Sequence, residues 1–173
     1  ISPELAVCGY PPLDLLKEDS FVYSCMKAVE RFAKENRDAP PLILGCPWIV
    51  NNACYNAAIL IEQGAISHVF TKRALPNYDV FDEKRYFIEG NHNNVLTLGG
   101  HHLLITICED LWALSPQQLI GKSLDSRTSL SAVINLSASP YAKNQQGERE
   151  KAIAHFAKEA NSLVAYCNQT GAN

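Results

Sequence analysis

The stretch LLITICEDLW, residues 103–112, carries the strongest structural signal in the sequence. Its apolar and β-branched first half predicts a buried strand that ends at residue 107. Cys108 follows directly, then two acidic residues, and a short helix is expected over residues 115–120. A cysteine at a strand end can expose its sulfur near backbone N–H groups, which would lower the pKa of its thiol below about 8.5. The alternative is a buried structural cysteine whose acidic neighbours cap a helix.

Further apolar strands and two amphipathic helices flank this stretch. Strands are predicted over residues 42–50, 56–62, 66–71, 95–98, 101–107, 131–136 and 163–167, and helices over residues 20–35 and 148–161. Gly99 and Gly100 separate two of the strands, as in a type I′ hairpin. This mixture of helices, strands and hairpins predicts a layered α/β fold with a mixed sheet. The irregular residues 72–94 are expected to form a binding loop, because long loops in compact domains are often functional.

The composition is that of one folded domain. The chain has 173 residues, of which 47% are hydrophobic and 19% charged, so it has enough apolar material for a core. A net charge of −3 without a long basic run argues against a nucleic-acid partner. No apolar run approaches the roughly 20 residues that cross a bilayer, so no membrane partner is expected.

The six cysteines are scattered along the chain without CxxC spacing. Neither a disulfide framework nor a zinc site is therefore predicted, and the histidines also lack a metal-binding spacing. We expect reduced thiols in a cytoplasmic protein, most of them buried as small hydrophobic residues.

Two other side chains could assist a reactive cysteine. Glu4 precedes the apolar residues 5–8, where burial could raise its pKa and make it a general base. Lys72 follows the predicted strand 66–71, where a desolvated cation could stabilise an oxyanion and offset the acids after Cys108. Each also has a plainer interpretation, Glu4 as a surface acid and Lys72 as a solvated surface lysine that contributes little to packing.

Taken together, these three positions and their flanks resemble a known family. A glutamate in PEL (residues 3–5), a lysine at a strand end and a cysteine in ICED (residues 107–110) are similar to the Glu-Lys-Cys triad of the nitrilase superfamily. Within that superfamily the chain resembles the glutaminase domains of glutamine-dependent NAD synthetases. The segments that carry this resemblance are GYPPLDLL at 9–16, KRALPNYDVFDEKRYF at 72–87, NLSASPY at 135–141 and YCNQ at 166–169.

The resemblance implies a layered α-β-β-α sandwich with mixed sheets. Residues 1–173 would form a single carbon-nitrogen hydrolase domain, incomplete at both ends, that hydrolyses glutamine to glutamate and ammonia. It assigns Cys108 as the nucleophile, Glu4 as the general acid and base, and Lys72 as the stabiliser of the oxyanion. The backbone N–H of Glu109 would be a second oxyanion donor.

Further positions match glutamine-binding residues of the family. Tyr78 and Ser139 match a tyrosine and a serine that bind glutamine, and Tyr10 and Glu109 match other pocket positions. A lysine that the family commonly has six residues after this serine is absent, because Gln145 stands at the aligned site. Either Gln145 or the nearby Lys143 could replace it. Arg149 falls where the family has a basic residue.

The resemblance also separates this chain from the ATP-using half of such enzymes. No Ser-Gly-Gly-x-Asp-Ser pyrophosphate loop occurs in the sequence, so the synthetase domain is not present in it. The chain is expected to need no cofactor, and ATP and Mg²⁺ are expected only for the missing domain. The expected partners are L-glutamine, a synthetase domain of the same polypeptide and further copies in a homo-oligomer. The alternatives are a stand-alone nitrilase-type amidase acting on another small amide, and a non-catalytic domain with the same fold.

Overall fold

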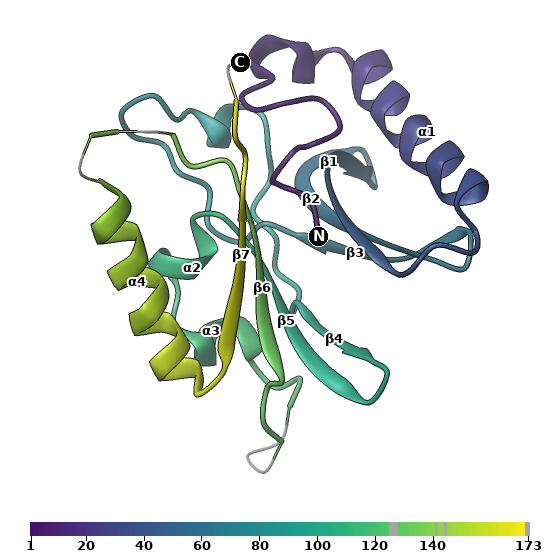
Figure 1. The fold of residues 1–173 in the computed structure, drawn as a ribbon. Coiled ribbons are helices and arrows are strands. Elements are labelled where there is room, and N and C mark those ends of the chain that lie inside the picture. The colour runs from purple at the N-terminus through teal and green to yellow at the C-terminus, as the bar shows by residue number, and fades with distance from the viewer. Residues whose placement is uncertain (125–127, 141, 144, 172–173) are drawn as a thin grey trace.

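Two β-sheets lie face to face between outer helices in the computed structural model, which describes residues 1–124, 128–140, 142–143 and 145–171 (Figure 1). The strands are β1 (Leu42–Val50), β2 (Ala53–Glu62), β3 (Ala65–Thr71), β4 (Val95–Leu98), β5 (His101–Ile107), β6 (Ala132–Ser137) and β7 (Leu163–Asn168). The helices are α1 (Asp19–Glu35), α2 (Asp110–Ala113), α3 (Pro116–Ile120) and α4 (Gln145–Ala160), with 3-10 turns η1 (Leu13–Lys17) and η2 (Glu83–Arg85).

The first sheet is antiparallel, in the order β1-β2-β3. The side chains of β1 alternate between its two faces, as the period of an extended strand requires. Ile43 faces the second sheet, whereas Cys46 and Trp48 face α1. The amphipathic helix α1 therefore forms the outer layer on this side.

The second sheet is mixed, in the order β4-β5-β6-β7. β4 and β5 form the predicted hairpin, in which Gly99 and Gly100 both have positive φ angles of 57° and 81°. β5, β6 and β7 are parallel, so their carboxyl ends meet at one edge of the sheet. Helices α2, α3 and α4 cover the outer face through Leu111, Leu119 and Phe156. Ligands of open α/β sheets bind at such an edge.

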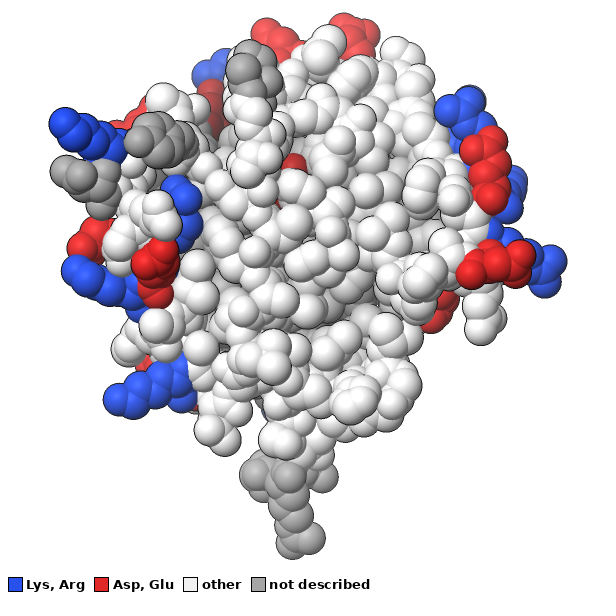
Figure 2. Space-filling model, in the orientation of Figure 1, with Lys and Arg blue, Asp and Glu red and all other residues white. Residues whose placement is uncertain are grey.

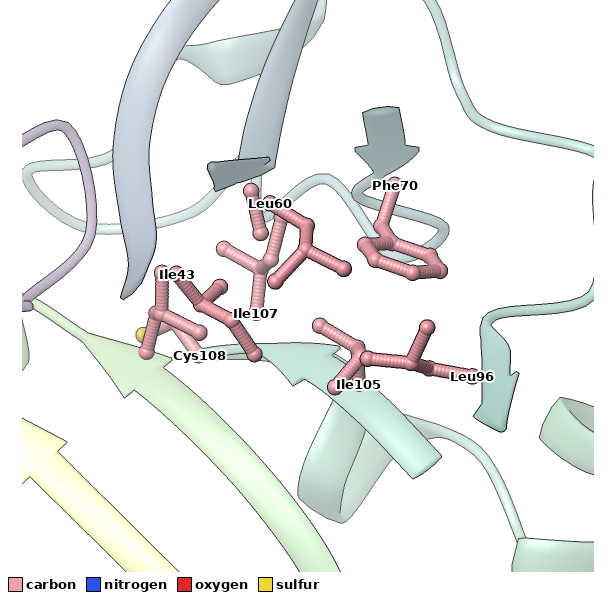
Figure 3. Close-up of a cluster of buried hydrophobic side chains, with 9 residues drawn as sticks. Ile43, Leu60, Phe70, Leu96, Ile105, Ile107 and Cys108 are labelled. Atoms are coloured by element: carbon pink, nitrogen blue, oxygen red, sulfur yellow. The ribbon is translucent and has the colours of Figure 1, made fainter. Parts of the chain in front are cut away.

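The apolar side chains between the sheets form the central core (Figure 3). Ile43, Leu60 and Phe70 of the first sheet pack against side chains of the second, which are Leu96, Ile105, Ile107 and Leu136. Cys108 lies at one end of this cluster. The arrangement of helix, two sheets and helices confirms the expected α-β-β-α layers.

The predicted elements are found with small shifts. β2 begins at Ala53 and α4 at Gln145, both three residues earlier than predicted, and α2 was not predicted separately from α3. Among the described residues no helix has the length and apolar character to cross a membrane. Figure 2 shows a face whose middle is almost free of charged side chains, with acidic and basic side chains interleaved at its sides over α1 and α4.

Candidate active site

Glu4 is held between the two sheets by the N-terminal segment. Val7 N–H donates to the Gly45 carbonyl of β1 (3.1 Å), and Glu4 N–H donates to the Ser137 carbonyl of β6 (3.4 Å). A Cβ at Gly45 would lie only 2.3 Å from the Pro3 carbonyl oxygen, so only glycine lets this segment approach β1 so closely. Glu4 is consequently 1% exposed.

Three groups donate hydrogen bonds to the Glu4 carboxylate. Lys72 Nζ and Asn56 Nδ2 both donate to Oε1, each at 2.7 Å, and Ala138 N–H donates to Oε2 at 3.0 Å. Lys72, directly after β3, is fully buried and also donates to Glu83 Oε1 at 2.8 Å. The interpretations of Glu4 and Lys72 as surface residues are therefore wrong, because the two side chains form a buried ion pair.

The cluster keeps Lys72 charged. Burial by itself lowers the pKa of Lys72, but Glu4, Cys108 and Glu83 outweigh this effect and raise the pKa above its ordinary value. A buried cation with two carboxylate partners is thus available at neutral pH. It supplies the positive charge that the sequence required near Cys108.

Glu83 is one site residue that the sequence did not reveal. It is buried in η2, and its Oε1 accepts hydrogen bonds from Lys72 and from Tyr10 Oη (2.8 Å). Burial, opposed by Lys72, raises the pKa of its carboxyl to about 7. Its sequence neighbours Asp82, Lys84 and Arg85 make the segment look like a solvated charged turn. The only local signal is its place within the long irregular segment.

Cys108 follows β5 in a strained turn. Its φ angle of 44° lies in the left-handed region, which costs a non-glycine residue of order 1–3 kcal/mol. Its N–H donates to the Leu136 carbonyl of β6 at 2.7 Å, and the chain then turns into α2. Strained residues of this kind are concentrated at active sites.

The thiol of Cys108 is not acidified by its surroundings. Burial, followed by the charge of Glu4, raises its pKa to about 12, although Lys72 opposes the change. The prediction of a lowered pKa is therefore wrong, because Cys108 is only 5% exposed and its thiol lies near the charge of Glu4. A thiol of this kind reacts only when a base takes its proton, and the Glu4 carboxylate is close enough to affect its titration.

Asp110 connects the cysteine turn to the lysine segment. Its Oδ1 accepts from the N–H groups of Arg73 (2.9 Å) and Ala74 (2.7 Å), and its Oδ2 accepts from Ile107 N–H (3.0 Å). Burial raises the pKa of this carboxyl to about 6, against the effect of these N–H groups. Asp110 thereby fixes the position of the Lys72 segment relative to Cys108.

A cavity of about 390 Å³ opens beside Cys108, within the size range of small-molecule sites. Tyr78, Glu109 and Ser139 line it. The Glu109 carboxylate accepts from Tyr78 Oη (2.9 and 3.0 Å) and from Trp112 Nε1 (2.7 Å). Burial and Glu109 raise the pKa of Tyr78 to about 12, so this hydroxyl stays protonated at neutral pH. The cavity thus presents a fixed carboxylate to a bound molecule.

The chain is similar to glutamine-dependent NAD(+) synthetases over nearly its whole length. It is 37% identical over 171 residues to that of Xanthomonas campestris pv. campestris (strain 8004), covering 98% of this chain and 30% of the relative. For Aquifex aeolicus (strain VF5) the values are 34% over 173 residues, 98% and 29%. The structure of the Acinetobacter baumannii enzyme in complex with ADP has a TM-score of 0.86 and 32% identity, covering 98% of this chain and 31% of that one.

The chain has a nitrilase-like fold and is similar to one part of the glutamine-dependent NAD(+) synthetases. It spans about 30% of the length of the synthetases it matches. No family model matches the chain. An amidase from Nesterenkonia sp. AN1, in a form with acrylamide added at its active-site cysteine, shares the fold of this nitrilase-like domain. Its TM-score is 0.76 at 21% identity, with 98% of this chain and 64% of the amidase covered.

Not every pocket position expected for this nitrilase-like domain faces the cavity. The side chain of Tyr10 donates to Glu83 and lines a neighbouring cavity, which shares Ser139, Pro140 and Arg149 with the cavity at Cys108. Gln145 and Arg149 of α4 line the Cys108 cavity, whereas Lys143 is exposed and does not. Tyr141, the last residue of the NLSASPY segment, lies outside the described residues.

One backbone N–H lies directly after Cys108 in the chain. Within the described part of the chain, the N–H of Glu109 has no hydrogen-bond partner. This group follows Cys108 directly, as an oxyanion donor next to a nucleophile does in other acyl-transfer sites. The nitrilase-like domain therefore has Lys72 and the Glu109 N–H as two candidate donors.

Proposed function

We propose that this chain hydrolyses the side-chain amide of L-glutamine to glutamate and ammonia. We further propose that the ammonia passes to an ATP-dependent synthetase domain of the same polypeptide, which amidates deamido-NAD to NAD. The observation that carries the proposal is the buried group of Glu4, Lys72 and Cys108 beside a cavity of suitable size. The family supports it, because relatives of about three times this length are glutamine-dependent NAD(+) synthetases.

In the proposed reaction, Glu4 takes the proton of the Cys108 thiol and the sulfur attacks the amide carbon of glutamine. Lys72 and the N–H of Glu109 stabilise the oxyanion of the tetrahedral intermediate. Glu4 returns the proton to the leaving nitrogen, which departs as ammonia and leaves a thioester on Cys108. Glu4 then takes a proton from water, which attacks the thioester, and glutamate departs as the thiol is protonated again.

The charges of the cavity favour an amino-acid amide over a neutral amide. Glutamine carries an α-ammonium and an α-carboxylate group besides its amide. Glu109, held by Tyr78 and Trp112, offers an acceptor for the ammonium group. Arg149 lines the same cavity and offers a donor for the carboxylate group. Ser139, close to Cys108, completes the set of polar groups around the amide.

The test compares two nitrogen sources in the full-length polypeptide. Cys108→Ala should abolish NAD formation from glutamine and leave NAD formation from added ammonium intact, with ATP and deamido-NAD supplied. Glu4→Gln should behave in the same way, because its proton transfers belong to the same half-reaction. If a folded Cys108→Ala protein lost both activities, the proposed division of labour would be wrong.

A stand-alone amidase is the second candidate, because the fold is shared with an amidase of which the chain covers 64%. It would be favoured if the wild-type polypeptide made NAD from neither nitrogen source yet hydrolysed a small amide. The glutaminase proposal also assigns ATP and Mg²⁺ to the synthetase domain alone. It places the enzyme in the cytoplasm, in keeping with the six unpaired cysteines, and it includes the expected homo-oligomer.

A further inference from the structure

Three hydroxyl groups form a cluster at the sulfur of Cys108. They belong to Ser137 at the end of β6, to Ser139 two residues later and to Tyr166 of β7. Ser137 Oγ donates to Cys108 Sγ at 3.4 Å, and Ser139 Oγ lies 3.7 Å from the same sulfur. The two serine oxygens are 3.0 Å apart. Tyr166 Oη lies 2.8 Å from Ser137 Oγ and donates to Ser139 Oγ at 3.1 Å. Neither Ser137 nor Tyr166 lines the cavity beside Cys108.

The fold holds this hydroxyl cluster in place. β6 and β7 are parallel, with Asn135 opposite Tyr166 and Ser137 opposite Asn168. Asn168 binds the backbone of Ser139 twice, since its Oδ1 accepts from Ser139 N–H (2.9 Å) and its Nδ2 donates to Ser139 O (3.2 Å). Ser137 is fully buried. The hydroxyls are therefore fixed by the sheet and do not depend on a bound substrate.

The proton count of the cluster favours a sulfur that accepts hydrogen bonds. Three hydroxyls carry three protons. If Tyr166 donates its proton to one serine, both serines can donate their protons to Cys108 Sγ. A thiolate can accept both hydrogen bonds, whereas a thiol carries its own S–H proton, which competes with them. Hydrogen bonds from Ser137 and Ser139 lower the pKa of the Cys108 thiol, against the larger effects of burial and Glu4.

We propose that Ser137 is a further catalytic residue, which stabilises the Cys108 thiolate by a hydrogen bond, and that Tyr166 is a positioning residue that orients the Ser137 hydroxyl. The inference rests on the proposed function, because it takes Cys108 as the nucleophile. No bond of Ser137 breaks in this step. The proton moves from Sγ to the Glu4 carboxylate, and the Ser137 hydroxyl, with Lys72 as the nearby cation, stabilises the negative charge left on sulfur.

Other ionisable groups also face Cys108 and must stay constant in a test. Glu4 and Tyr10 come from the N-terminal segment, and Lys72 and Tyr78 from the segment after β3. Glu109 follows Cys108 directly, and Tyr166 lies on β7. Ser137→Ala removes none of these groups. A change in the titration of Cys108 in that variant therefore reports the hydroxyl alone.

The test measures thiolate formation without substrate. Alkylation of Cys108 by iodoacetamide would be followed by peptide mass spectrometry across pH in the full-length wild-type and variant polypeptides. Ser137→Ala should lower the rate about tenfold at each pH below the thiol pKa, which corresponds to a rise of about one pKa unit. Tyr166→Phe should lower it about threefold, because a mis-oriented serine hydroxyl loses only part of its hydrogen bond. Ser67→Ala on β3 and Tyr55→Phe on β2, outside the hydroxyl cluster, should match the wild type.

Steady-state kinetics separate this role from substrate binding. Ser137→Ala should lower kcat for glutamine hydrolysis about tenfold with KM unchanged, whereas Ser139→Ala, at the cavity wall, should also raise KM. The inference is overturned if Ser137→Ala and Tyr166→Phe are alkylated at the wild-type rate while glutamine hydrolysis persists. If Ser137→Ala does not fold, Tyr166→Phe alone decides between these outcomes. A wild-type enzyme that hydrolyses no glutamine would instead refute the proposed function.

Discussion

Cys108 and Cys46 are both buried thiols, but the groups around them differ in kind. Cys46 is fully buried on the face of β1 that packs against α1, among apolar side chains such as Val29, Trp48 and Ala57. Cys108 lies at the end of the core between the sheets, where a carboxylate, an ammonium and two hydroxyls surround it. Burial is the first cause of a raised pKa for both thiols.

The comparison shows that burial alone does not distinguish a nucleophile from a structural cysteine. Neither thiol ionises readily by itself at neutral pH. Cys108 differs because the Glu4 carboxylate can take its proton and because Lys72 and Ser137 can stabilise the charge that remains. Cys46 has no such neighbours in the part of the chain that the structure describes, because Glu4 on the N-terminal segment and Lys72 after β3 lie at the edge where β5 and β6 end.

The largest expected difference between the two cysteines is in covalent labelling. An electrophilic glutamine analogue should modify Cys108 stoichiometrically in the full-length enzyme and leave Cys46 unmodified, because Cys108, unlike Cys46, lies near the Glu4 carboxylate and lines a cavity. Peptide mass spectrometry would measure both. Glu4→Gln should abolish the labelling of Cys108. Preferential modification of Cys46, Cys8 or Cys167 would contradict the assignment.

Removing the cation should have the next largest effect. Lys72→Met should lower glutamine turnover about 10²–10³-fold, the usual cost of losing one oxyanion donor. It should also destabilise the fold by about 3–5 kcal/mol at neutral pH, because Glu4 and Glu83 lose their buried partner. Urea unfolding and turnover would be compared with Lys84→Met, in which an exposed lysine is replaced. A Lys72→Met protein with over half the wild-type turnover would refute the role of Lys72.

The strands could be predicted from the sequence, but the burial and the electrostatics of the three residues proposed as the triad could not. The apolar runs and the Gly99-Gly100 hairpin were predictable because their signals are local. The burial of Lys72 and Glu83 depends on the loop 72–94 folding back onto Glu4, which is 68 residues before Lys72 in the chain. The raised pKa of Cys108 has the same origin. Single-residue patterns contain no information on such distant partners.

Glu83→Gln tests whether the second carboxylate partner of Lys72 contributes to the ionic surroundings of Cys108. We expect turnover to fall about tenfold, because the amide keeps an acceptor for Lys72 and Tyr10 but loses the charge-assisted bond. Stability should also change its pH dependence. The pKa of Glu83 is about 7 in the fold against an ordinary 4.5, so the folded state binds more protons between these values. Wild-type stability should therefore fall as pH rises from about 4.5 to about 7.

The Glu83→Gln protein should lack this part of the slope. Urea unfolding at several pH values in that window would measure it, with Glu89→Gln as the control, since Glu89 is an exposed carboxylate. An unchanged slope in Glu83→Gln would show that Glu83 does not titrate in this range.

The smallest effect on stability and turnover is expected for substitution of Cys46, the thiol with apolar surroundings. Cys46→Ala removes one sulfur from a well-packed layer between β1 and α1, which should cost about 1 kcal/mol of unfolding free energy. Among the described residues, the Cys46 thiol donates to the carbonyl of the next residue, Pro47, at 3.3 Å and to no side chain. Glutamine turnover and KM should remain at wild-type values, because Cys46 packs in the apolar layer between β1 and α1 and does not line the cavity beside Cys108. Urea unfolding and steady-state kinetics on the same preparation would measure the two quantities separately. A tenfold loss of turnover without a matching loss of stability would contradict the purely structural role of Cys46. The face of β1 toward α1 would then have to influence Glu4 through Gly45 and the N-terminal segment, and the position of that segment would depend on packing that looks purely structural.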